Sequence, residues 1–209
     1  NMPEGFSLEM GRLSDDFNTT LNFVFNNPQL GTIYRFDGSV LFKNESLKGS
    51  LIFDTQKLAE YLNANSKDFK LDKKYDLPLS VSTAITIDKT KLELSDLVMK
   101  YGQTAAAGNI IIPRPVEVTD WAQKDKEERL KIEMAFNMTD VDLDLAEAFA
   151  REYGGKYFKG EKFEPDFDWD VIGDIKAVKG KYRQQNIKNL DLSFDIVPEI
   201  VHIKRFNMI

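Results

Sequence analysis

Apolar residues recur at every second position along most of this 209-residue chain, in short runs separated by glycine, proline, asparagine and aspartate. In residues 79–88 the odd positions are mainly leucine, valine and isoleucine, and most even positions are serine, threonine or aspartate. A period of two is typical of β-strands with one buried and one solvent-exposed face. Because strands buried on both faces would be apolar throughout, the pattern predicts a mainly β fold of the α+β type, with a curved antiparallel sheet. Similar alternation marks residues 21–25, 47–53, 132–138, 163–171 and 187–196.

Two segments depart from this alternation and predict short helices, each directly after a strand. In the first, Asp54 or Thr55 can cap a helix whose apolar residues have the i, i+3, i+4 spacing of one helical face, namely Leu58, Ala59, Tyr61 and Leu62. The second begins near Thr139 and ends at Gly154 and Gly155, which suit a left-handed C-cap.

The same order of elements occurs twice and indicates an internal repeat. The run LKGSLIF at residues 47–53 matches LKIEMAF at residues 130–136, and a helix is predicted after each. Chance similarity between short alternating strands is the alternative explanation. The repeat interpretation divides the chain into trailing strands of a preceding copy (1–40), a first strand-helix-strand copy (41–118), a charged connection (119–129) and a truncated second copy (130–209).

Composition and motifs exclude several classes of function. The net charge is −6 and basic residues are scattered, so nucleic-acid binding is not expected. The chain has no cysteine, which excludes a disulfide framework and thiolate chemistry. Asp140, Asp142 and Asp144 imitate the start of a calcium loop, but Leu145 and Arg151 occupy the positions that need glycine and a bidentate acid.

Catalytic machinery is also missing from the sequence. His202 is the only histidine and has no nearby serine or acidic partner in sequence, so we interpret it as a polar residue on the solvent face of a strand. No G-x-S-x-G elbow and no phosphate-binding glycine loop is present. We therefore predict a non-enzymatic protein with no catalytic residue, no metal site and no cofactor.

Two short helices can cover only a small part of the apolar face that so many alternating strands would form. One interpretation is a closed sandwich or barrel in which the apolar face is simply the core. The other is an open sheet whose apolar face meets a ligand or a partner.

Residues 47–62 (LKGSLIFDTQKLAEYL) and 92–113 (LELSDLVMKYGQTAAAGNIIIP) resemble the AsmA family of bacterial envelope proteins. That family has a strand, a helix, and then a strand pair with two glycines. The likeness covers about residues 40–209, although the second copy ends before its own glycine pair. The matching positions are Asp54, Leu58, Leu62, Leu94, Leu97, Gly102 and Gly108 in the first copy, and Leu130, Phe136, Leu143 and Leu190 in the second.

The resemblance implies a periplasmic protein of Gram-negative bacteria that takes part in outer-membrane biogenesis. Members of the family look like proteins anchored to the inner membrane, which implies that this chain would meet the membrane through segments outside the given sequence. They are similar to repeat-built bridge proteins that conduct phospholipid along an apolar groove. The implied partners are phospholipid or another acyl lipid, and envelope proteins.

Two functional hypotheses follow. In the first, the chain binds or conducts lipid. In the second, it is a structural scaffold for outer-membrane protein assembly that pairs through exposed strand edges. The candidate lipid-binding residues are Leu79, Val81, Ile85 and Ile87 in the first copy, and Ile132, Met134, Phe136, Phe167 and Trp169 in the second.

Overall fold

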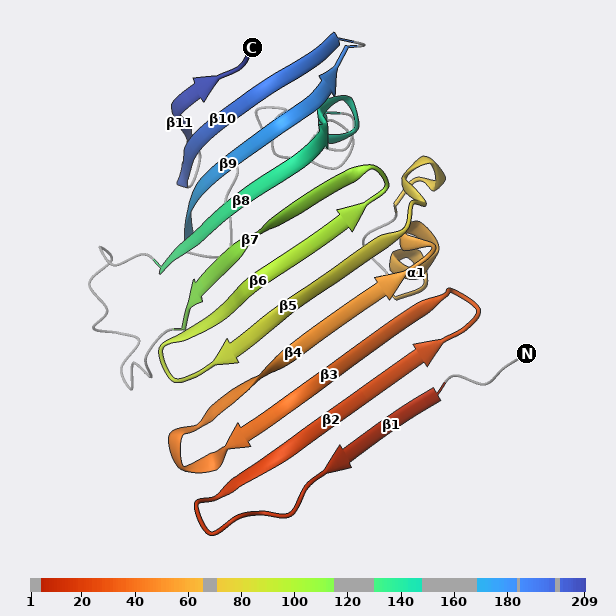
Figure 1. Ribbon diagram of the computed structural model, residues 1–209, viewed down its shortest axis with the longest axis vertical. Helices are drawn as coiled ribbons and strands as arrows, with labels where there is room; N and C mark the ends of the chain where they lie inside the picture. Colours follow the sequence, from red (N-terminus) through yellow and green to blue (C-terminus); the bar gives the residue numbers. More distant parts are fainter. Residues whose placement is uncertain (1–4, 66–70, 115–129, 148–168, 184, 198–199) are drawn as a thin grey trace. The chain divides into compact units, whose positions relative to one another are not determined.

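A computed structural model describes residues 5–65, 71–114, 130–147, 169–183, 185–197 and 200–209 (Figure 1). The chain divides into two compact units, Asn1–Gly102 (unit 1) and Gln103–Ile209 (unit 2). Strands dominate both units, so the predicted mainly β fold is confirmed. Each unit is described below by itself.

Unit 1 is an open sheet of six strands in chain order, each antiparallel to the next. Tight connections join most of its strands, whereas a helix and a 3₁₀ turn separate the fourth from the fifth. Its elements are β1 (Gly5–Met10), β2 (Asn18–Asn27), β3 (Thr32–Leu41), η1 (Phe42–Asn44), β4 (Ser46–Thr55), α1 (Leu58–Asn65), η2 (Lys73–Tyr75), β5 (Leu79–Ile87) and β6 (Lys91–Tyr101).

Unit 2 contains five described strands, again paired in chain order. Residues 143–147, directly after the second of these strands, are helical, so a helix is present where the sequence predicted one. It begins later than predicted, because Thr139 still belongs to the preceding strand. The end predicted for this helix, Gly154 and Gly155, lies outside the described residues. The strands are β7 (Thr104–Pro113), β8 (Leu130–Asp142), β9 (Trp169–Tyr182), β10 (Gln185–Val197) and β11 (Ile200–Asn207).

One pairing in unit 2 departs from the predicted antiparallel arrangement. β8 and β9 are parallel, from Leu130 opposite Trp169 to Asp142 opposite Lys181. Parallel neighbours need a connection that carries the chain back to its starting end, which takes a dozen or more residues. Residues 143–168 separate these strands and are long enough for that crossover. The equivalent connection of unit 1, residues 56–78, leads instead into an antiparallel strand.

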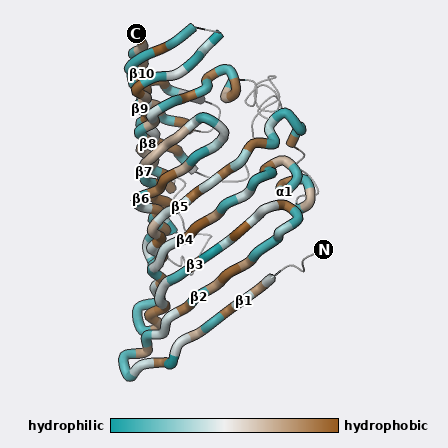
Figure 2. The backbone as a smooth tube through the Cα atoms, turned by 45° about the vertical axis from the view of Figure 1, so that its right-hand side comes forward, coloured by the Kyte–Doolittle hydropathy of each residue, from teal (hydrophilic) through white to brown (hydrophobic). Residues whose placement is uncertain are grey.

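Register shifts explain why the strands bend rather than lie flat (Figure 2). The β5–β6 pairing shifts between Ser82 and Ala84, and Asp96 on the facing strand has a positive φ of 50°. A second shift lies between Ala105 and Ala106 in the β7–β8 pairing. An extra residue in one strand increases the local twist and bends the sheet.

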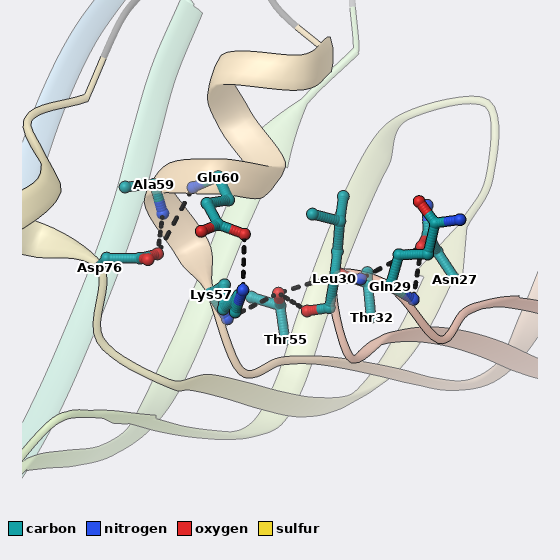
Figure 3. A network of polar contacts seen from close by, with 9 residues as sticks. All are labelled: Asn27, Gln29, Leu30, Thr32, Thr55, Lys57, Ala59, Glu60 and Asp76. Carbon is teal, nitrogen blue, oxygen red and sulfur yellow. Dashed lines mark hydrogen bonds and ion pairs between the residues drawn. The ribbon is translucent and has the colours of Figure 1, made fainter. Parts of the chain in front are cut away.

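The helix α1 is held by a carboxylate that is distant in sequence (Figure 3). Asp76 Oδ1 accepts hydrogen bonds from the backbone N–H groups of Ala59 (3.0 Å) and Glu60 (3.4 Å). Of the two predicted caps, Thr55 accepts only from the backbone N–H of Lys57 (3.3 Å). An acidic group at a helix N-terminus satisfies free N–H groups and suits the helix dipole. The loop after η2 therefore fastens α1 to the sheet end.

Thr55 also takes part in a fully buried hydroxyl pair. Its Oγ1 lies 2.9 Å from Thr32 Oγ1 on the neighbouring strand, and both residues are 0% exposed. Thr55 Oγ1 is in addition 3.5 Å from the carbonyl oxygen of Leu30, to which it donates. The two threonines are thus unequal, because Thr55 has further partners.

We expect Thr55→Val to lower the free energy of unfolding by about 1–3 kcal/mol, because the Thr32 hydroxyl is left buried without its partner. Thr32→Val should lower the free energy of unfolding by less, because the Thr55 hydroxyl still donates to the carbonyl oxygen of Leu30. The double variant should lower the free energy of unfolding by less than Thr55→Val alone, because the Thr32 hydroxyl is then no longer left buried without a partner. Urea denaturation of the three variants measures this, and strictly additive losses would contradict the pairing.

Candidate functional site: an apolar sheet face

Cross-strand register places most apolar residues of unit 1 on one face of its sheet. Directly opposed residues of neighbouring strands point to the same face, so a face can be followed from strand to strand. One row runs from Leu21 through Gly38 and Gly49 to Ile85 and Leu94. We call this the apolar face of unit 1; it further comprises Phe6, Leu8, Met10, Phe23, Phe25, Tyr34, Phe36, Val40, Leu47, Leu51, Phe53, Leu79, Val81, Ile87, Leu92 and Met99.

The four candidate residues of the first copy, Leu79, Val81, Ile85 and Ile87, all lie on this face. Each is half-buried, as expected for one layer of strands that packs sideways against its neighbours. Figure 2 shows apolar and polar residues alternating along these strands. Exposure increases toward β1, where Phe6 is 66% and Met10 60% exposed. The apolar face of unit 1 is therefore a surface that solvent reaches over much of its area.

α1 covers only one end of this face. The Tyr61 ring packs 5.9 Å from that of Tyr34 and 5.5 Å from that of Phe53, centroid to centroid. The Tyr34 and Tyr61 hydroxyls are hydrogen-bonded, and burial, followed by this bond, raises the pKa of Tyr34. An eight-residue helix is about 12 Å long, whereas a ten-residue strand is about 33 Å. α1 therefore does not cover the part of the apolar face that lies farther along the strands, away from the α1 end.

A small buried core of unit 1 lies beside α1. Ala59, Leu71 and Tyr75 are 1–3% exposed, whereas the strand residues of the apolar face are half-buried or exposed. The Tyr101 hydroxyl donates to the carbonyl oxygen of Tyr75 (2.9 Å) and joins this small core to β6. α1 and η2 thus cover one end of the sheet of unit 1 with a small buried core.

Unit 2 has an apolar face built in the same way. One row runs from Ile110 through Met134, Gly173 and Phe194 to Ile203. The candidates Ile132, Met134 and Phe136 share this face and are half-buried. Its other members are Ala106, Gly108, Met138, Val171, Ile175, Ala177, Leu190, Leu192, Ile196 and Phe206.

A short helix also begins over one end of the unit 2 face. Val141, Ala177 and Leu190 form a buried cluster, against which Met138 and Leu143 pack. Asp142 Oδ1 accepts from the backbone N–H of Leu145 (2.9 Å) and caps the helical residues 143–147. Of the three acids that imitate a calcium loop, Asp142 thus serves the helix N-terminus. Asp140 instead pairs with Lys179 (3.1 Å), and Asp144 accepts from the backbone N–H of Arg183 (2.6 Å).

The two remaining candidates fall at or before the start of β9. Phe167 lies outside the described residues. Trp169 is the first residue of β9, with its backbone opposite Leu130.

Glycines shape both apolar faces, and among those described here only Gly108 was a position that matched the family pattern. A Cβ added at Gly38 or Gly49 would collide with the Phe36 ring, and one at Gly173 with the Phe194 ring. Phe194 is directly opposite Gly173, and Phe136 is directly opposite Gly108, where a Cβ would again meet the ring. Aromatic rings over facing glycines are a known way to stabilise sheets. The aromatic rings therefore lie over the facing glycines and form part of each apolar face.

The opposite face of unit 2 is charged. Arg205 Nη2 lies 2.9 Å from Asp191 Oδ1 and 3.2 Å from Asp174 Oδ1, which links three strands. Lys204 pairs with Asp195 (2.6 Å), and His202 is directly opposite Asp195 and exposed. His202 therefore lies on the solvent face, as predicted.

Other kinds of site find little support in the described part of the chain. A surface pocket of about 400 Å³ lies in the loops of unit 1 and is lined by Asp15, Asp16, Phe17, Phe42 and Lys43. No three His, Cys, Asp or Glu side chains of the described residues gather as metal ligands would. Among the described helices, none has the length and apolar composition needed to cross a bilayer. Comparison with protein-family models, curated proteins and solved structures finds no match for this chain.

Proposed function

We propose that this chain is a non-enzymatic envelope protein that binds acyl lipid on its apolar sheet faces. The observation that carries the proposal is the apolar face of unit 1, where some twenty apolar side chains share one face and α1 covers one end alone. Large exposed apolar patches on a folded protein mark surfaces that bind a ligand, a partner or a membrane.

The dimensions of unit 1 suit an acyl chain. Six strands spaced by about 4.8 Å give a face about 24 Å wide across the strands. One leaflet of a bilayer's hydrocarbon core is about 15 Å thick, so an acyl chain can lie fully on the face. Each methylene that leaves water contributes about 0.8 kcal/mol, so lipid can bind without a specific polar group.

The cellular setting rests on the family resemblance. We propose that the chain belongs with AsmA-like envelope proteins, is held in the periplasm by an inner-membrane anchor elsewhere in the full protein, and contributes to outer-membrane biogenesis. The tandem strand-helix order of β4 with α1 and of β8 with residues 143–147 supports this proposal.

Lipid analysis of the purified protein tests the proposal. Protein purified from bacteria without detergent should carry phospholipid, seen as added mass in native mass spectrometry and identified after extraction. Delipidated protein should take up a fluorescent fatty acid that competes with phospholipid. Protein that is folded, free of lipid and unable to bind the probe would contradict lipid binding.

The scaffold hypothesis is the second candidate. It is favoured by one observation, the exposed strand β1, which pairs with β2 alone among the described residues. A scaffold function predicts that envelope proteins pair with a strand edge and does not require bound lipid.

A further inference from the structure

Two tyrosine hydroxyls meet on the apolar face of unit 1, at the end that α1 covers. Tyr34 lies on β3 and Tyr61 on α1, and their hydroxyls are hydrogen-bonded to each other. Both side chains are half-buried. We call these two residues the tyrosine pair; it is a polar spot among apolar side chains.

Aromatic rings surround the tyrosine pair on the sheet. The Tyr34 ring lies 4.5 Å from that of Phe53 and 6.0 Å from that of Phe25, centroid to centroid, and both residues are directly opposite Tyr34 on the neighbouring strands. Burial, followed by the hydrogen bond to Tyr61, raises the pKa of Tyr34, and no cationic side chain of the described residues contributes to this shift. Tyr34 therefore keeps its proton at neutral pH and offers a neutral donor.

A count of donors shows what the tyrosine pair still lacks. Each tyrosine hydroxyl has one O–H donor, and its oxygen can also accept. One O–H is used between the two hydroxyls, so the other has no acceptor among the described residues. A donor that loses contact with water costs free energy unless it finds a new acceptor. A ligand that covers this end of the face is therefore favoured if it brings an acceptor of its own.

We propose that the tyrosine pair donates a hydrogen bond to the ester carbonyl of an acyl lipid whose chain lies along β3 and its neighbouring strands. This inference rests on the proposed lipid binding, and it adds the class of lipid and its direction on the face. An ester carbonyl is a neutral acceptor at the polar end of an acyl chain. It suits a neutral donor better than a carboxylate does, because a carboxylate taken out of water needs a compensating charge.

The position of Tyr34 along β3 sets the direction of the lipid. From Tyr34 the apolar face continues through Phe36 and Gly38 to Val40, six residues farther along the strand. Six residues of strand extend about 20 Å, whereas one leaflet of a bilayer's hydrocarbon core is about 15 Å thick. Toward the start of β3 only two residues remain, about 7 Å, which is too short for an acyl chain. The carbonyl group therefore lies at the α1 end, and the chain runs away from α1.

Two matched lipids test the proposal on the intact, delipidated protein. Palmitoyl lysophosphatidylcholine contains the ester carbonyl, and its hexadecyl ether analogue lacks it. Each is titrated below its micellar concentration, and displacement of the hydrocarbon probe diphenylhexatriene reports binding. The wild type should bind the ester lipid about three- to tenfold more tightly than the ether lipid, as one hydrogen bond between neutral groups allows. This comparison needs no variant.

Removal of the hydroxyls assigns this preference to the tyrosine pair. The double variant Tyr34→Phe/Tyr61→Phe should bind both lipids equally, with the affinity of the ether lipid unchanged. Each single variant should keep most of the preference, because the remaining hydroxyl still has an O–H to donate. Tyr182→Phe is the control, since it removes a half-buried tyrosine hydroxyl from unit 2 and should leave the preference intact. Circular dichroism confirms that the variants fold.

The possible outcomes separate this inference from the proposed function. If the wild type binds both lipids equally, or if the preference persists in the double variant, the hydrogen bond to the ester carbonyl is overturned while lipid binding stands. Palmitate that binds more tightly than the ester lipid, and loses this advantage in the double variant, overturns the ester in favour of a free carboxylate. A wild type that binds neither lipid contradicts the proposed function and this inference with it.

Discussion

Replacing Ile85 by aspartate is expected to remove most of the lipid that the protein retains, while the sheet stays folded. Ile85 lies on the apolar face of unit 1, opposite Gly49 and Leu94 and far along β5 from the end that α1 covers. An acyl chain on this part of the face would have to desolvate the new carboxylate. A cost of about 2 kcal/mol or more for an unpaired polar group corresponds to a loss of more than tenfold in affinity.

Thr86→Asp is the matched control, because it adds the same charge one position away on the opposite face. Thr86 is opposite Lys48 and Glu93, so the surroundings there are already polar. Native mass spectrometry and fatty-acid titration of both variants, with circular dichroism to confirm the fold, make the comparison. If Ile85→Asp binds lipid as the wild type does, the uncovered part of this face is not the binding surface.

The largest loss of stability is expected from Tyr75→Ala, at about 3–5 kcal/mol. Tyr75 is 1% exposed and is among the largest fully buried side chains of the described residues. Its removal leaves a cavity in the small core beside α1, which has few other buried residues to close it. Because Asp76 follows directly and holds the N-terminus of α1, we also expect the helix to loosen.

Urea denaturation followed by circular dichroism measures this loss. Phe42→Ala is the control, since Phe42 is 51% exposed and its removal should change the free energy of unfolding by about 0.5 kcal/mol or less. A loss below about 1 kcal/mol for Tyr75→Ala would show that the small buried core beside α1 contributes little to the stability of unit 1.

Alternation alone predicted the faces of most strands correctly. Leu79, Val81, Ile85 and Ile87 share a face in β5, and Ile132, Met134 and Phe136 share one in β8, as their two-residue spacing requires. The predicted helix at residues 54–62 is also present as α1, with Ala59 buried and Tyr61 against the sheet. These features depend on local periodicity, which is written directly in the sequence.

The alternation of apolar and polar residues did not predict the second half of the strand β9. This strand continues to Tyr182, but its two buried residues there, Ala177 and Gly180, are three positions apart, and Val178 between them is 66% exposed. Asn189 on the facing strand has a positive φ of 54°. Such irregularities shift the side-chain order by one residue, so a strict period of two fails at that point.

The sequence by itself determined that this chain folds into strands with one apolar and one polar face, that two short helices follow strands, and that no familiar catalytic motif is present. Tertiary structure alone decided that β8 and β9 run parallel and that Asp76 rather than Asp54 holds α1. The physical reason is one of range. Side-chain alternation is set between residues two positions apart, whereas strand direction and capping by distant residues depend on how separate segments meet in space.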